Sequence, residues 1–116
     1  MYESINQLVG EITSLAVVIS SNAKIDIFME YMPHCNTLYI RVYKDGWSKS
    51  NDADIEESLC TKPRKYRTEK EILNKLHQIK QQFIRIARKG KINFSKLPYE
   101  IVQVKNYHLV RSEEDE

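Results

Sequence analysis

The stretch TEKEILNKLHQIKQQFIRIARK, from Thr68 to Lys89, decides the fold because it reads as one long amphipathic helix. Thr68 and Glu71 have the capping-box spacing, in which each side chain accepts a hydrogen bond from an otherwise unpaired N–H at the helix start. Gly90 follows and can take the left-handed conformation that ends a helix. The pattern therefore predicts a helix over 68–89.

Apolar residues recur along this helix at alternating steps of four and three, which places them on one face. They are Ile72, Leu76, Ile79, Phe83 and Ile86, with Leu73, Ile84 and Ala87 beside them. The opposite face is rich in cations and amides, namely Lys70, Asn74, His77, Gln78, Gln81, Arg85 and Arg88. We expect the apolar stripe to lie in the core and the opposite face to offer a binding surface.

The preceding part of the chain predicts a second helix and a hairpin. The same spacing of apolar residues predicts a helix over 3–20. Alternating apolar and polar residues predict strands over 24–31 and 38–43, and the turn 33–37 joins them as an antiparallel pair.

Less regular patterns occupy the remaining segments. Residues 47–58 are polar and predict a loop, and 59–67 predict an edge strand that tolerates Pro63. A short strand is expected at 92–94. Residues 101–110 favour a longer strand because they are rich in β-branched residues, although a closing helix that starts after Ser95 also fits their spacing.

These elements predict an α+β protein with two amphipathic helices packed on a small, mainly antiparallel sheet, in the order α-β-β-(β)-α-β(β). The chain has 116 residues, of which 41% are hydrophobic, and this suffices for one core. We therefore expect a single domain over 1–111 and an acidic C-terminal tail over 112–116.

The first residues lack the cationic opening of a signal peptide. The longest apolar run, 15–19, is far shorter than the roughly 18 residues of a membrane span. These features predict a cytoplasmic protein without membrane contact, in which Cys35 and Cys60 are reduced thiols. Abundant Ile, Lys, Asn and Tyr indicate an AT-rich genome, such as those of low-GC bacteria and their phages.

Catalytic and metal-binding patterns are incomplete in this sequence. His34 and Cys35 are adjacent, and adjacent residues of a turn rarely face each other as a nucleophile and its base must. Cys60 has no partner at the Cys-x-x-Cys spacing typical of zinc sites, and three glycines cannot build a phosphate loop. We expect neither enzymatic activity, nor a cofactor, nor a bound metal.

Two sets of residues are candidates for binding. Cations before and along the second helix could neutralise phosphates, while its amides could reach base edges. This first set comprises Arg64, Lys65, Arg67, Lys70, Asn74, His77, Gln78, Gln81, Arg85, Arg88 and Lys89. Tyr39, Arg41 and Tyr43 could stack bases on the sheet, or pack across the strands.

The middle two thirds of the chain resemble a double-stranded RNA-binding domain. The likeness lies in the element order, in the turn at Pro33 and His34, and in the basic cluster that includes Arg64 and Lys70. It implies minor-groove contacts from the turn and phosphate contacts from the start of the second helix. The chain departs from the family at Met32, where the family's turn has Gly, and it lacks the family's Ala-rich Lys motif.

Two functions follow as hypotheses. The first is a small non-enzymatic binding protein of phage or mobile-element origin, which acts as an inhibitor or adaptor by contacting a host protein. The second is a nucleic-acid-binding accessory protein that uses the basic helix 68–89. The apolar helix stripes also allow a homodimer.

Overall fold

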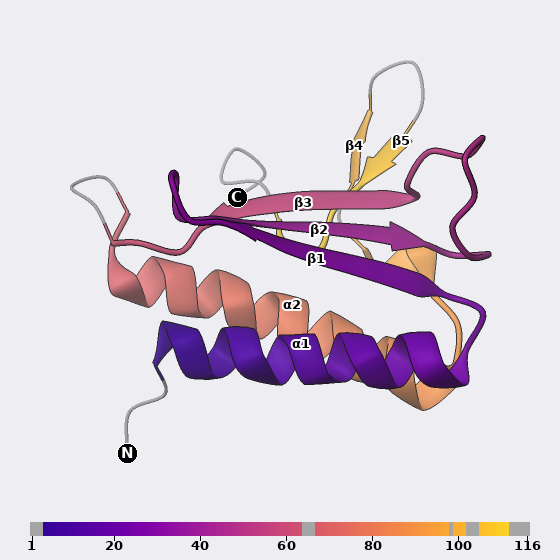
Figure 1. The fold of residues 1–116 in the computed structure, drawn as a ribbon, viewed down its shortest axis with the longest axis horizontal. Helices are drawn as coiled ribbons and strands as arrows, with labels where there is room; N and C mark the ends of the chain where they lie inside the picture. Colours follow the sequence, from indigo (N-terminus) through magenta and orange to yellow (C-terminus); the bar gives the residue numbers. More distant parts are fainter. Residues whose placement is uncertain (1–3, 64–66, 98, 102–104, 112–116) are drawn as a thin grey trace.

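The computed structural model describes residues 4–63, 67–97, 99–101 and 105–111. Within these ranges the chain forms two helices, a five-stranded sheet and one short 3-10 turn (Figure 1). The elements are α1 (Ile5–Asn22), β1 (Asp26–Met32), β2 (Thr37–Tyr43), β3 (Ile55–Cys60), α2 (Glu69–Lys89), η1 (Phe94–Lys96), β4 (Tyr99–Ile101) and β5 (Lys105–Tyr107).

The sheet has the strand order β1-β2-β3-β5-β4. β1 with β2, β2 with β3 and β4 with β5 are antiparallel pairs, whereas β3 and β5 are parallel. Both helices lie on the same face of the sheet (Figure 1). The predicted α+β class, with two helices on a mainly antiparallel sheet, is confirmed.

The ends of α2 form where the sequence predicts them, whereas α1 spans Ile5–Asn22 and so begins and ends two residues later than the predicted 3–20. The Thr68 hydroxyl accepts a hydrogen bond from the Glu71 N–H at 3.2 Å, and Gly90 has a φ of 70°. At the start of α1 the Ser4 hydroxyl accepts from the Gln7 N–H at 3.0 Å. Each cap satisfies an N–H or a carbonyl that the helix itself leaves unpaired, so the capping residues define where each helix begins and ends.

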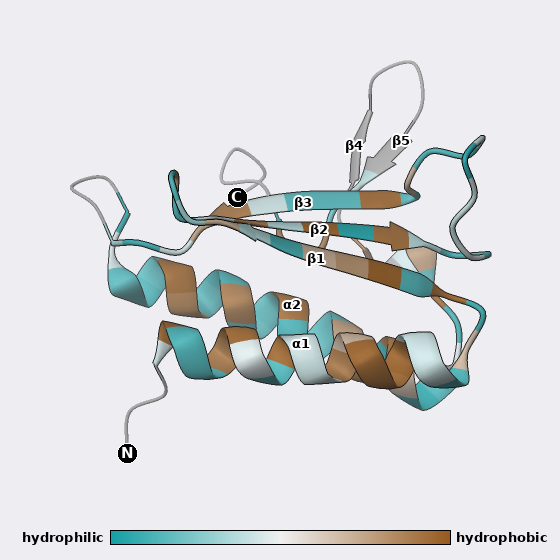
Figure 2. Cartoon of the chain, viewed as in Figure 1, coloured by the Kyte–Doolittle hydropathy of each residue, from teal (hydrophilic) through white to brown (hydrophobic). Residues whose placement is uncertain are grey.

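The core lies between the helices and the sheet. The predicted α2 stripe is buried from Ile72 to Ile86 at its five central positions, and Phe83 is fully inaccessible. The flanking Leu73 and Ile84 are half-buried, and Ala87 is exposed. Hydrophobic residues recur along both helices, while β3 is hydrophilic in its middle and hydrophobic at both ends (Figure 2). Lys80 of α2 donates a hydrogen bond to the Glu11 carboxylate of α1 at 2.8 Å and so links the two helices. This hydrogen bond lowers the pKa of the Glu11 carboxyl.

The third strand is displaced from its predicted place at 59–67. The observed strand β3 starts at Ile55 because Ile55 and Leu59 both face the core, and it ends at Cys60, before Pro63. Three polar residues between these two apolar positions obscured the alternation. Residues 64–66 of the predicted strand lie outside the described residues.

The C-terminal strands also differ in their limits. The predicted strand at 92–94 is wrong, because the Asn93 side chain accepts from the Ser95 N–H at 3.2 Å and caps the 3-10 turn η1. The predicted strand 101–110 contains β5 and the last residue of β4. The expected acidic tail 112–116 lies outside the described residues.

Truncation of Phe83 tests the packing. We expect Phe83→Ala to lower the free energy of unfolding by about 3–5 kcal/mol, because it leaves a cavity under both helices. The exposed Gln81→Ala is the matched control on the same helix and should change it by less than about 0.5 kcal/mol. Urea unfolding measures both. Equal effects of the two changes would contradict this packing.

Candidate binding surfaces

The first surface is an outward stripe on α2, which consists of Lys70, Asn74, Gln81, Arg85 and Arg88. All five side chains are exposed. Among the described residues, the three cations of this stripe have no carboxylate within ion-pair distance. The α2 stripe therefore presents positive charge and amide groups to solvent.

The other residues of the predicted set lie apart from the α2 stripe. His77 is half-buried and close enough to Glu11 of α1 to contribute to its lowered pKa. Gln78 accepts a hydrogen bond from the Arg111 N–H at 3.4 Å. Arg67 is half-buried before the helix, and Lys89 is exposed at its end. The predicted Arg64 and Lys65 lie outside the described residues.

The second surface is the face of the sheet away from the helices, which we call the open face. Phe28 and Tyr39 project from it, with exposed fractions of 40% and 42%, and Trp47 of the following loop is 53% exposed. Tyr43 points the same way but is only 5% exposed. Its ring lies 5.5 Å from that of Phe28, which lies 6.5 Å from Trp47. Tyr43 thus supports the Phe28 ring and is itself too buried to stack on a ligand.

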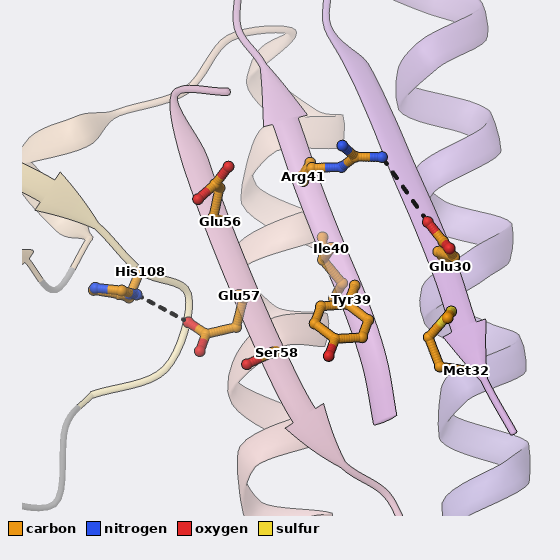
Figure 3. Close-up of a pocket in the computed structure, with 9 residues that line it drawn as sticks. All are labelled: Glu30, Met32, Tyr39, Ile40, Arg41, Glu56, Glu57, Ser58 and His108. Carbon is orange, nitrogen blue, oxygen red and sulfur yellow. Dashed lines mark ion pairs between the residues drawn. The ribbon is translucent and has the colours of Figure 1, made fainter. Parts of the chain in front are cut away.

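Arg41 of β2 also projects from the open face and is exposed. Its guanidinium is 5.8 Å from the centroid of the Phe28 ring and 4.0 Å from the Glu30 carboxylate. A shallow hollow of about 590 Å³ lies beside it (Figure 3). The hollow is lined by Glu30, Met32, Tyr39, Ile40, Arg41, Glu56, Glu57, Ser58 and His108.

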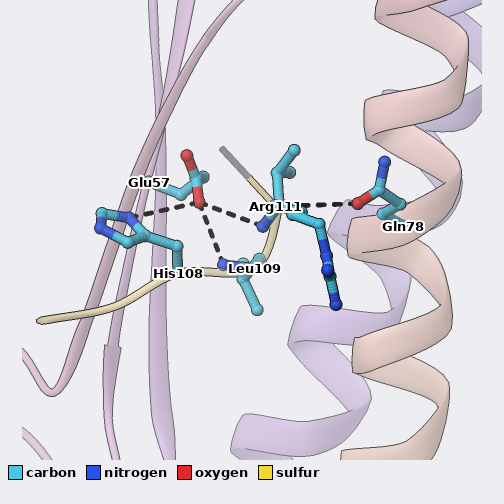
Figure 4. A network of polar contacts seen from close by, with 6 residues as sticks. Glu57, Gln78, His108, Leu109 and Arg111 are labelled. Atoms are coloured by element: carbon cyan, nitrogen blue, oxygen red, sulfur yellow. Dashed lines mark hydrogen bonds and ion pairs between the residues drawn. The ribbon is translucent and has the colours of Figure 1, made fainter. Parts of the chain in front are cut away.

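Glu57 occupies the edge of this hollow and binds the C-terminal segment (Figure 4). One of its carboxylate oxygens accepts from the N–H groups of Leu109 and Val110, at 3.0 and 3.3 Å, and lies 3.6 Å from His108 Nδ1. Burial raises the pKa of the Glu57 carboxyl, although these N–H groups, His108 and Lys75 oppose the change. Its contacts hold residues 108–111 against β3.

The sequence patterns did not indicate this role of Glu57. The signal that could have found it is its place between Ile55 and Leu59, where alternation puts an acid on the side that faces the core. A carboxylate in that position needs donors, and the C-terminal segment supplies them.

The described ranges contain no metal-binding cluster, no disulfide and no membrane-spanning helix. No group of three His, Cys, Asp or Glu residues there is placed to hold a metal ion. Cys35 and Cys60 are free thiols. Neither described helix is long and apolar enough to cross a membrane.

Comparisons of the chain with protein-family models, curated proteins and solved structures found no match. The functional assignment therefore rests on the surfaces themselves.

Substitution of Glu57 tests its role in stability. Because the folded pKa is raised above its ordinary value of 4.5, ionisation costs folding free energy as the pH rises from that value through the folded pKa. Glu57→Gln keeps an acceptor without a charge, so its stability should not fall over this window. Glu57→Ala should lose about 1–3 kcal/mol because two N–H groups lose their acceptor.

Urea unfolding at pH 4.5, 6 and 7.5 measures all three proteins. The free energy of unfolding of the wild type, minus that of Glu57→Gln, should fall as the pH rises. If the free energy of unfolding of the wild type instead rose with pH relative to that of Glu57→Gln, the assigned direction of the pKa shift would be wrong.

Proposed function

We propose that this chain is a small non-enzymatic binding protein of phage or mobile-element origin, which acts in the cytoplasm as an inhibitor or adaptor and contacts a host protein through its open face. The observation that carries the proposal is the exposure of Phe28, Tyr39 and Trp47 around Arg41. Aromatic residues and Arg are enriched at the centres of protein interfaces, where truncation of a few side chains removes most of the affinity.

The arrangement of the open face supports a protein partner. The Tyr43 ring packs in a T-shaped contact against the Phe28 ring, and Phe28 in turn contacts Arg41. Side chains held in place before binding lose less conformational entropy when they are covered. The adjoining hollow can accept a side chain of the partner.

The charges of the open face favour a protein over a nucleic acid. Glu30 and Glu56 flank Arg41 on β1 and β3, and both are exposed. Two carboxylates beside one guanidinium repel a phosphate backbone, whereas they attract Lys or Arg of a protein partner. We therefore infer an apolar partner surface with a basic rim.

Truncation of the exposed rings tests this proposal. We expect wild-type protein, immobilised and exposed to nuclease-treated host lysate, to retain a protein in stoichiometric amount. The double variant Tyr39→Ala, Trp47→Ala should lower its recovery at least about tenfold, because both rings are exposed and would lie in the contact.

The matched control is Asn74→Ala, Gln81→Ala, which truncates two exposed side chains of the α2 stripe and should leave the recovery unchanged. Equal recovery by the wild type and the Tyr39, Trp47 variant would refute a contact through the open face. Circular dichroism of each variant verifies its fold.

A second candidate function is nucleic-acid binding through the α2 stripe, and it is favoured by the cations of the stripe, which have no carboxylate partner among the described residues. The resemblance to a double-stranded RNA-binding domain implies contacts from the turn at 33–36 and from the start of α2. The turn is tied to the segment that leads to α2, since the N–H and hydroxyl of Thr61 donate to the Asn36 carbonyl at 2.8 and 3.1 Å.

Charge reversal tests the second candidate. We expect Arg85→Glu, Arg88→Glu to abolish salt-sensitive retention on duplex RNA at low ionic strength, because each cation that neutralises a phosphate releases a counterion. The Tyr39→Ala, Trp47→Ala variant is the control and should be retained like the wild type. A wild-type protein that shows no retention on duplex RNA or duplex DNA would exclude this function.

A further inference from the structure

β1 is one of the two edge strands of the sheet, and among the described strands it pairs only with β2 (Figure 1). Its seven residues contain no proline, and Tyr31 is 49% exposed. The outer side of an edge strand carries unpaired N–H and C=O groups, which other strands can bind.

Two hydrogen bonds identify these groups. The Val42 carbonyl of β2 accepts from the Asp54 N–H at 2.9 Å, so the peptide groups of Val42 point toward β3 and away from its partner Ile27. The Ile27 N–H accordingly donates to the Ser20 hydroxyl of α1, at 3.1 Å, and not to β2. Because peptide groups alternate along a strand, those of Ile27, Met29 and Tyr31 lie at the open edge.

Ser20 already satisfies the Ile27 N–H. Among the described residues, no other hydrogen bond is made to the outer side of β1. The Ile27 carbonyl and the N–H and C=O groups of Met29 and Tyr31 therefore remain available. They suffice for four hydrogen bonds to a second antiparallel strand of the same kind.

We propose that the occupant of this edge is β1 of a second copy of the chain, antiparallel, with Met29 opposite Met29. In this register Met29 exchanges two hydrogen bonds with its counterpart. Each Tyr31 N–H donates to the Ile27 carbonyl of the other copy. The Ile27 N–H stays on Ser20, so the pairing does not compete with the bond inside each chain.

Charge selects this register over its neighbours. Centring the pair on Glu30 would oppose Glu30 to itself, and centring it on Phe28 would oppose Glu30 to Asp26. Like charges directly opposite each other destabilise a strand pair. Centred on Met29, Glu30 faces Phe28 of the other copy, and the half-buried Ile27 faces Tyr31. The contact is the same from both copies, as a two-fold interface requires.

The contact is separate from the proposed host partner, because it uses the edge of β1 and not the open face. It would join two open faces into one surface across a ten-stranded sheet. Each copy contributes five strands to that sheet.

A proline at the open edge tests the pairing. Tyr31→Pro removes an outward N–H without removing a bond to β2, which is the position where an edge strand tolerates proline. Tyr31→Ala loses the same side chain and keeps the N–H. In sedimentation velocity from micromolar to millimolar concentration, wild type and Tyr31→Ala should form dimers. Tyr31→Pro should raise the dissociation constant at least about tenfold, since two of the four hydrogen bonds are lost.

Three results would overturn the proposal. The first is a wild-type chain that stays monomeric at every concentration, which would leave the edge of β1 to a strand of another protein. The second is a Tyr31→Pro variant that dimerises as well as the wild type. The third is an equal loss of dimer in Tyr31→Pro and Tyr31→Ala.

A cross-link decides the outcome if Tyr31→Pro fails to fold. In a Cys35→Ser, Cys60→Ser background, Met29→Cys should form an intermolecular disulfide on mild oxidation, because directly opposite residues have Cα atoms about 5.5 Å apart. Glu30→Cys should not. A disulfide from Glu30→Cys, or none from either variant, would contradict the register.

Discussion

Both helices of this protein must bury their apolar stripes against one side of one sheet, and the rest of the structure depends on that constraint. The stripes of α1 and α2 share one core with Leu38, Ile40 and Val42 of strand β2, and the Lys80–Glu11 ion pair links the two helices. A sheet covered on one side only leaves its other face in water. The open face, with its exposed aromatic residues, is thus a direct result of where the helices lie.

Much of this fold follows from the sequence, because the core is periodic. The four-and-three spacing from Ile72 to Ile86 and the cap residues at Thr68 and Gly90 predict α2 to within a residue. The hairpin of β1 and β2 follows from alternation in the same way. β3 did not, because Glu56, Glu57 and Ser58 give it the composition of a loop. Burial of Glu57 depends on donors from Leu109 and Val110, some fifty residues later, which no local pattern contains.

The binding surfaces were less predictable than the fold, because they depend on which residues are neighbours in space. Helical spacing places Gln78 on the same predicted binding face as Gln81, yet the side-chain oxygen of Gln78 accepts a hydrogen bond from the Arg111 N–H of the C-terminal segment. Tyr39 and Tyr43 are equivalent in an alternating strand, but only Tyr43 is buried, with the Phe28 ring packed against it. The available groups at the edge of β1 likewise follow from the register with β2 and from Ser20, and not from composition.

The central claim is that the uncovered face of the sheet, and not the cationic helix, contacts the partner. Hydroxyl-radical footprinting of the chain, free and bound to its captured protein, tests this most directly. We expect Tyr39 and Trp47 to be modified in the free chain and protected in the complex, while buried Phe83 stays unmodified in both. Continued modification of Tyr39 and Trp47 in the complex, with new protection along α2, would contradict the account.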